Sequence, residues 1–276
     1  MSRLRRTLLA LAGALLLAAG VACTGGEPGP GPSGSAEPSV TATPTLPPVG
    51  VGCQELTAQG ETLRLRNSAK LDIAAVDLGS GQKGVVLAHQ SDANMCQWAA
   101  YATLLAQHGY RVVAFDFAGF GTSSPTDDKT YLDDIRTVVE YLRQEGVERV
   151  VVIGASMGAA MTVAAAAGAI IPPVDGVVAV SPPRSFDGVY AERAAPNLRT
   201  SALIIAGDDD GDYEVYAREI FESTPTEFGE LLVVAAPQHG VELVGAQTSA
   251  GAQVRAAIND FLERHLTAPV ATSPPR

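Results

Sequence analysis

The chain has 276 residues, of which 46% are hydrophobic, and a formal net charge of −11 at pH 7. A chain of this length can form one sizeable core of about 200 residues or more. Its acidic surface repels phosphate backbones, which argues against a nucleic-acid partner.

The first residues predict an export signal. Several arginines near the N-terminus precede an apolar run, residues 8–19, that is too short to span a bilayer comfortably. The stretch that ends at Cys23 resembles a bacterial lipoprotein signal, in which the cysteine becomes the lipidated N-terminus, although Gly20 stands where that signal usually has an aliphatic residue. The same stretch also fits an ordinary secretory cleavage site. We therefore expect an exported protein, either anchored to the outer face of the cell membrane by a lipid on Cys23 or secreted if Cys23 is not lipidated.

The composition divides the chain into four parts. The signal covers residues 1–23, and the Gly, Pro, Ser and Thr of residues 24–51 predict a disordered tether, because such a segment cannot bury a core. Residues 52–268 carry the apolar pattern of one folded domain without internal repeats. Residues 269–276 are expected to be a disordered tail, and the domain is expected to be a monomer.

The three cysteines are consistent with export. If Cys23 carries a lipid, only Cys53 and Cys96 remain to pair, and an oxidising compartment permits a disulfide between them. The closed loop of about 43 residues would stabilise the fold by up to roughly 4 kcal/mol in the chain-entropy model. The alternative is two buried free thiols.

Strand-like and helix-like segments alternate from Cys53 onward. Residues 62–66 and 71–77 alternate apolar and polar side chains, which predicts two half-exposed strands, and their closeness suggests an antiparallel pair. Six short apolar runs suit strands covered on both faces, as in a parallel sheet: residues 84–88, 111–115, 150–153, 176–180, 202–206 and 231–236. Helical patterns occupy residues 98–107, 131–143, 212–222 and 253–265. These eight strands with interleaved helices predict one α/β domain with a mostly parallel sheet.

The sequence Gly-Ala-Ser-Met-Gly at residues 154–158 lies between a predicted strand and a helix-compatible run. A serine hydroxyl is a poor nucleophile unless a base can take its proton, and a tight strand-to-helix turn would project Ser156 toward such a base. Gly154 and Gly158 supply the small neighbours that so sharp a turn needs. The N–H groups and dipole at the start of the following helix favour a developing oxyanion. Ser156 is therefore a candidate nucleophile, although Gly-x-Ser-x-Gly alone also occurs by chance.

The order of the polar residues strengthens this interpretation. An acidic run, residues 208–212, follows the predicted strand 202–206, and His239-Gly240 follows the strand 231–236. In a parallel sheet, residues at the carboxyl ends of strands meet at one edge. The series Ser156, then an acid, then His239 is the chain order of the α/β-hydrolase fold.

At these residues the chain resembles the α/β-hydrolase superfamily, over about residues 53–268. The resemblance includes the serine turn, the loop that begins at Asp116, the acidic run and His239-Gly240. Two positions depart from the family pattern: Ala118 stands where an arginine is usual, and the His-Gly oxyanion turn appears as His89-Gln90.

The resemblance implies a role for each matching residue. Ser156 would be the nucleophile and His239 its base, with Asp210 as the acid that orients His239. Asp212 is the next choice for that acid, followed by Asp208 and Asp209. The backbone N–H groups of Met157 and Ser91 would hold the oxyanion.

We therefore expect an exported serine hydrolase that acts through an acyl-enzyme on small-molecule esters or other acyl compounds. No cofactor is expected, and the acidic run lacks the histidine or spaced glutamate that a metal site would need. The short insertion at residues 181–200 is expected to be a small lid over an open cleft. A peptidase, a thioesterase or a dienelactone-type hydrolase on the same fold stays open, and so does a non-catalytic lipoprotein that uses the cleft to bind a ligand.

Overall fold

The computed structural model describes residues 45–267, which belong to a single domain. The predicted signal peptide, Cys23, most of the predicted tether and the predicted tail lie outside the described residues.

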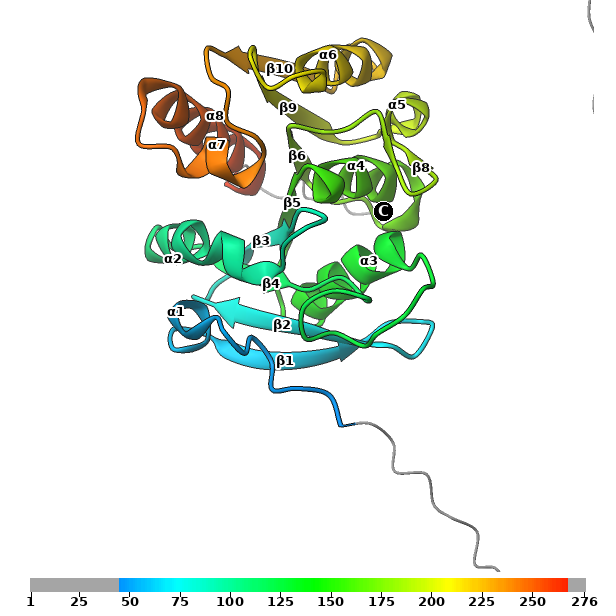
Figure 1. The fold of residues 1–276 in the computed structure, drawn as a ribbon, viewed down its shortest axis with the longest axis vertical. Helices are drawn as coiled ribbons and strands as arrows, with labels where there is room; N and C mark the ends of the chain where they lie inside the picture. The colour runs from blue at the N-terminus through cyan, green and yellow to red at the C-terminus, as the bar shows by residue number, and fades with distance from the viewer. Residues whose placement is uncertain (1–44, 268–276) are drawn as a thin grey trace, which may run out of the picture. The chain divides into compact units, whose positions relative to one another are not determined.

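An eight-stranded sheet forms the centre of the domain (Figure 1). Its strands run in the order β1-β2-β4-β3-β5-β6-β9-β10, with β1 and β2 antiparallel, β2 and β4 antiparallel, and every other neighbouring pair parallel. The bounds are β1 (Glu61–Arg66), β2 (Asp72–Leu78), β3 (Lys83–Ala88), β4 (Arg111–Phe115), β5 (Arg149–Ala155), β6 (Gly176–Val180), β9 (Ser201–Gly207) and β10 (Gly229–Val234). The predicted fold class, with eight strands in a mostly parallel sheet, is confirmed.

Helices cover both faces of this sheet, which is why its central strands are apolar throughout. In β5, Val150 and Val152 face one hydrophobic core, and Val151 and Ile153 face the other. The first core is completed by α3 (Tyr131–Gln144), α4 (Met157–Ala164), η2 (Ala165–Ala169) and α6 (Tyr213–Ser223). The second is completed by α1 (Gln54–Thr57), η1 (Met95–Trp98), α2 (Ala99–Gln107), α7 (Val241–Gly245) and α8 (Ser249–Leu266). Trp98 is fully buried in the second core and does not line a cleft.

A disulfide joins Cys53, directly before α1, to Cys96 in η1, with their Cα atoms 5.3 Å apart. The predicted pairing is therefore present in the structure. The bond attaches the start of the domain to the segment that follows β3. Because β3 leads into the turn at His89, the disulfide lies close along the chain to one part of the site described below.

The chain before Cys53 contacts the domain. The Gly50 N–H donates to Thr122 Oγ1 at 3.2 Å, and the Arg64 guanidinium donates to the Thr122 carbonyl at 2.9 Å and to the Pro47 carbonyl. Residues 47–50 therefore lie against the loop that follows β4.

The insertion after β6 contains a short hairpin, β7 (Ser185–Phe186) and β8 (Val189–Tyr190), followed by α5 (Ala191–Ala194) and η3 (Ala195–Asn197). Its two-residue turn is Asp187-Gly188, with φ +48° and +86°, as a type I′ turn requires. Asp187 accepts hydrogen bonds from Lys129 Nζ at 2.5 Å and from the Tyr131 hydroxyl at 3.0 Å. The hairpin is thereby attached to the beginning of α3.

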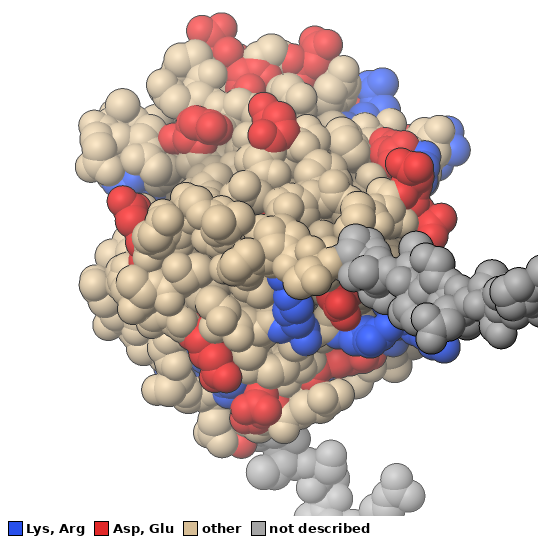
Figure 2. Space-filling view, turned by 60° about the horizontal axis from the view of Figure 1, so that its bottom comes forward, with Lys and Arg blue, Asp and Glu red and all other residues tan. Residues whose placement is uncertain are grey.

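Charged side chains are dispersed over the described surface. On the face shown in Figure 2, acidic groups lie scattered around a wide area without charged side chains, and basic groups are fewer. Among residues 45–267, no helix has the length and apolarity needed to cross a membrane.

Candidate active site

Ser156 occupies a strained turn between β5 and α4. Its φ is +48° and its ψ −117°, a backbone conformation that residues other than glycine rarely adopt. The Ser156 N–H donates to the Val180 carbonyl at 2.9 Å, which fixes the turn to the end of β6. The residue is 8% exposed. A nucleophile turn requires this geometry, which places the candidate nucleophile Ser156 at the carboxyl edge of the sheet.

Close backbone approaches explain the two glycines around Ser156. A Cβ on Gly154 would lie 2.2 Å from the Gly158 carbonyl oxygen, and a Cβ on Gly158 would lie 2.4 Å from the Ala88 carbonyl oxygen. No side chain fits at such distances. The start of α4 is therefore pressed against the end of β3, next to His89.

His239 pairs with Asp210. The imidazole Nδ1 lies 2.9 Å and 3.0 Å from the two carboxylate oxygens, and the Asp210 side chain is 7% exposed. The neighbouring acids have other contacts: Asp208 accepts from the Ala236 N–H at 3.0 Å, and Asp212 accepts from the Tyr216 hydroxyl at 3.3 Å. Asp209 is exposed. Of the acidic run, the structure thus brings Asp210 to His239.

The loop that carries His239 lies beside the serine turn. A Cβ on Gly240 would lie 3.4 Å from the Cβ of Ala155, the residue before Ser156. Within residues 45–267, no hydrogen bond joins the Ser156 hydroxyl to His239. In unliganded enzymes such contacts are often long and tighten when substrate binds.

His89 holds the turn that follows β3. Its Nε2 accepts from the Phe117 N–H at 3.1 Å, and its Nδ1 lies 2.6 Å from the Gln90 carbonyl oxygen, so the ring is neutral with the proton on Nδ1. Burial lowers the pKa of His89, against the opposing effects of the Gln90 carbonyl and the Asp116 charge. Of the two predicted oxyanion donors, Ser91 follows His89 and Gln90 in the same turn, and Met157 begins α4, where its N–H has no acceptor within the helix.

Asp116 anchors its own loop. Its Oδ2 accepts from the Thr122 N–H at 2.7 Å and from the Thr122 hydroxyl at 3.1 Å, and its Oδ1 accepts from the Met95 N–H at 2.8 Å. In the same loop Ala118 is buried, and its N–H donates to Asp134 at 3.0 Å.

Aromatic rings surround the site. The ring of Tyr213, at the start of α6, lies 4.1 Å from that of His239, measured between centroids. The rings of Phe117 and Phe120 pack edge-on against His89 at 5.1 Å and 5.2 Å. Tyr213 thus limits how far the imidazole can turn away from Asp210.

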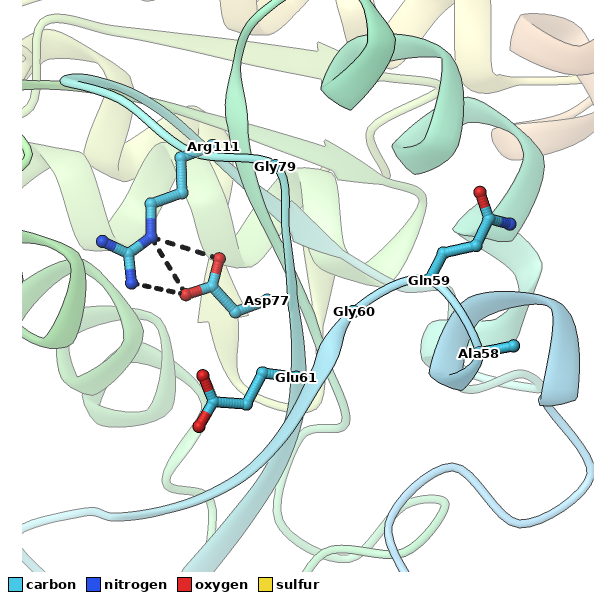
Figure 3. A pocket seen from close by; sticks show the side chains of 7 residues that line it. All are labelled: Ala58, Gln59, Gly60, Glu61, Asp77, Gly79 and Arg111. Carbon is cyan, nitrogen blue, oxygen red and sulfur yellow. Dashed lines mark hydrogen bonds and ion pairs between the residues drawn. The ribbon is translucent and has the colours of Figure 1, made fainter.

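A polar hollow of about 410 Å³ lies at the end of the sheet where the parallel strands begin, away from Ser156. Figure 3 shows the residues that line it. It contains Arg111 at the beginning of β4 and Asp77 near the end of the antiparallel β2. Arg111 donates to Asp77 Oδ2 at 2.7 Å and 3.0 Å, and Tyr141 donates to the same oxygen at 2.8 Å. The guanidinium is therefore already neutralised, and the cluster joins β2, β4 and α3. Within residues 45–267, no three His, Cys, Asp or Glu side chains are placed to hold a metal ion.

The sequence analysis assigns no role to three residues that lie near the candidate active site, Tyr213, Ser181 and Gln90. Tyr213 lies directly after the acidic run, which is the only signal that it gives. Ser181 begins the insertion, and Gln90 stands out only as a departure from the His-Gly pattern. Their contacts depend on loops that meet in space and that no sequence period describes.

Comparisons with known proteins agree with the fold. A solved esterase from Pyrococcus furiosus superposes with a TM-score of 0.65 at 18% identity, covering 77% of this chain and 94% of that chain. An esterase from Rhodococcus superposes with a TM-score of 0.60 at 16% identity, covering 74% and 99%. These likenesses show the fold.

Sequence relatives match over shorter stretches. A 2-hydroxy-6-oxononadienedioate/2-hydroxy-6-oxononatrienedioate hydrolase from Pseudomonas putida is 37% identical over 94 residues, which are 32% of each chain. The chain spans between 20% and 35% of the length of the curated relatives that it matches. Residues 85–274 match the alpha/beta hydrolase family as a whole. The chain therefore belongs to the alpha/beta hydrolase family.

Proposed function

We propose that the protein is an exported carboxylic ester hydrolase that uses Ser156, His239 and Asp210 and passes through an acyl-enzyme. The observation that carries the proposal is the pairing of His239 with Asp210 beside a serine held at φ +48° between β5 and α4. A strained serine and a carboxylate-paired histidine at one edge of the sheet have no structural need of each other, whereas nucleophilic catalysis needs both.

In the first step, the Ser156 oxygen attacks the ester carbonyl carbon while His239 Nε2 takes the hydroxyl proton. Asp210 accepts from His239 Nδ1, so it fixes the tautomer that leaves Nε2 free and stabilises the imidazolium that forms. The negative charge moves onto the former carbonyl oxygen. The N–H groups of Met157 and Ser91 are the donors that would hold it.

In the second step, the tetrahedral intermediate collapses and the alkoxide leaves with the proton from His239 Nε2. Water then attacks the acyl-enzyme by the same route, with His239 as base, and releases the acid and free Ser156. The sum is ester plus water giving acid plus alcohol. No cofactor enters this sequence.

Esters of modest size suit the site best. The insertion over α4 is a short hairpin with two short helices, not a separate cap domain. The names of the structural neighbours, which include several esterases, support ester hydrolysis over the other reactions of the family.

A fluorophosphonate probe tests the proposal. The domain should be labelled, and Ser156→Ala should abolish labelling and lower the turnover of p-nitrophenyl acetate by about 10³-fold or more, because the nucleophile is lost. Ser185→Ala, which changes an exposed serine of β7, is the matched control and should behave as wild type. A folded wild-type protein that neither labels nor hydrolyses the ester contradicts the proposal.

A panel with one acyl group and three leaving groups separates the alternatives. Esters, thioesters and anilides of the same acid should be compared by kcat/KM. We expect the ester to be the best substrate. A thioester or an anilide that is clearly better would replace the proposal with a thioesterase or a peptidase.

A further inference from the structure

The backbone directly after His239 is held by two side chains from other loops. The Gly240 N–H donates to Ser181 Oγ at 3.0 Å, and the Val241 N–H donates to Gln90 Oε1 at 2.7 Å. Ser181 follows β6, and Gln90 follows β3. Two consecutive N–H groups are thus bound to acceptors that are distant in sequence.

These two bonds supply acceptors for N–H groups at the start of α7 (Val241–Gly245). The first N–H groups of a helix, beginning with that of the residue directly before it, lack intrahelical acceptors. Gly240 precedes α7 and has no side chain. Its φ of +54° and its tight contact, in which a Cβ would lie 2.2 Å from Gln90 Oε1, leave no room for one. The N–H groups of Glu242 and Leu243 donate to the His239 and Gly240 carbonyls at 3.1 Å and 3.2 Å, so the N–H groups of Gly240 and Val241 are the two that need acceptors from elsewhere in the fold.

Each acceptor also belongs to a loop that carries a proposed catalytic group. Val180 accepts from the Ser156 N–H at 2.9 Å, and the next residue, Ser181, accepts from Gly240. Ser181 thus connects the nucleophile turn to the His239 loop. Gln90 precedes Ser91, so it connects the oxyanion turn to the same loop.

Both acceptors are polar residues in buried positions. Ser181 is fully buried at φ +49°, which is unfavourable for a residue with a Cβ. Gln90 is 6% exposed and stands where the resemblance expects glycine. Its own N–H is bound to Gln97 Oε1 at 2.7 Å, which fixes the backbone from which its side chain reaches Val241.

We propose that Gln90 and Ser181 are positioning residues for His239. By holding the N–H groups of residues 240 and 241, they fix the loop that carries His239, so that the imidazole stays paired with Asp210 beside the serine turn. The proposal rests on the proposed function. It adds that the glutamine at position 90 substitutes a side-chain contact for the glycine of the usual turn.

The test compares kcat and KM for p-nitrophenyl acetate in four variants. Gln90→Met keeps the length of the side chain but removes the acceptor, and Ser181→Ala removes a single oxygen. Each should lower kcat by about 10-fold or more with KM within about twofold, because small displacements of a catalytic group act on the reaction step. Gln90→Glu retains an acceptor oxygen for the Val241 N–H and should recover most of the lost kcat. Gln253→Met, on the exposed side of α8, is the matched control and should match wild type.

Circular dichroism and active-site titration with the fluorophosphonate probe accompany the kinetics, so that rates refer to folded, competent protein. Unchanged kcat per competent site in both Gln90→Met and Ser181→Ala would overturn the proposal. So would folded Gln90→Glu with a kcat as low as that of Gln90→Met. Should Gln90→Met fail to fold, Ser181→Ala decides alone by the same criterion. Wild type that neither labels nor turns over would refute the proposed function, and this inference with it, whereas active wild type with indifferent variants refutes the inference alone.

Discussion

Asp134 is a buried carboxylate that lacks a cationic partner among the described residues. It accepts from Asn67 Nδ2 at 2.7 Å, from the Ala118 N–H at 3.0 Å and from the Thr130 hydroxyl at 3.2 Å. Burial raises its pKa from 3.8 to about 6, although these hydrogen bonds act to lower it. Ala118 contributes a backbone N–H to this carboxylate, and no salt bridge among residues 45–267 includes Asp134.

Asp134 should therefore make the protein less stable as the pH rises. A carboxyl with a raised folded pKa binds its proton more tightly in the native state, so its contribution to stability is lost between about pH 4 and pH 6. The difference between 3.8 and about 6 corresponds to ~3 kcal/mol. We predict that the free energy of unfolding of Asp134→Asn, relative to wild type, increases by ~2–3 kcal/mol between pH 4 and pH 7, measured by urea unfolding.

The adjacent Asp133 is the control, because it should behave in the opposite way. Burial acts to raise the pKa of Asp133, but hydrogen bonds from Ser68 and Arg136 outweigh it and lower the pKa. Asp133→Asn should therefore lose stability relative to wild type as the pH rises. Parallel pH profiles for Asp134→Asn and wild type would show that the buried carboxyl does not titrate as argued.

Single residues were predictable where chemistry and chain order act together. Ser156, Asp210 and His239 could be selected because each follows a strand and each is a residue type that acyl transfer needs. Gln90 and Ser181 could not, because only the folded structure shows which N–H groups they reach. A glutamine in a turn has no sequence pattern that names its partner.

The β7–β8 hairpin belongs to the insertion that the sequence analysis expects to be a small lid. Asp187 attaches it to α3 through Lys129 and Tyr131. Burial and the Asp187 carboxylate raise the pKa of Tyr131 to about 12, so its hydroxyl remains a donor over the physiological range. The ion pair is more than a third exposed on both sides, and exposed pairs contribute little to global stability.

Asp187→Gly should loosen the hairpin without unfolding the domain. Glycine preserves the positive φ of the turn but removes both contacts of the carboxylate. We predict faster hydrogen exchange at residues 185–190 and an unchanged melting temperature, followed by mass spectrometry and calorimetry. Lys129→Met, which removes the ion pair and leaves the Tyr131 contact, should give a smaller increase. Exchange as slow as in wild type for Asp187→Gly would mean that core packing alone holds the hairpin.

Elements differ in how far the sequence predicted them. The strands β4 and β6 have the predicted bounds, because short apolar runs between charged or small residues leave little choice. Helix α8 begins four residues before the predicted start, at a turn capped by Thr248, since its small first residues show no amphipathic period. The hairpin was not predicted, although Asp187-Gly188 between Phe186 and Val189 is a strong signal for a type I′ turn. Its strands are only two residues long, which is too short for an alternating apolar and polar pattern to be recognised.

At the scale of the molecule, the fold class was predictable because the alternation of strands and helices extends over the whole domain. Attachment to a membrane is a separate proposal that depends on Cys23. We predict that Cys23→Ala shifts the protein from the membrane fraction to the soluble fraction of the exported material, because one acyl-carrying residue is lost. Fractionation with the exposed substitution Ser185→Ala as control checks this, and the control should remain with the membrane. Equal partition of Cys23→Ala and wild type would favour secretion without a lipid.

The contact of Gly50 with Thr122 holds the end of the predicted tether, residues 24–51, against the domain. Thr122 belongs to the loop bound by Asp116, and Pro47, three residues before Gly50, accepts from Arg64 of β1, so the described chain begins beside β1, the outermost strand of the sheet (Figure 1). From Gly50 back to Cys23 is a span that, fully drawn out, could not exceed ~100 Å. A lipid at that end would hold the domain within about this distance of the bilayer. Substrates released from, or displayed on, the envelope would then be met at a far higher local concentration than substrates in the surrounding medium.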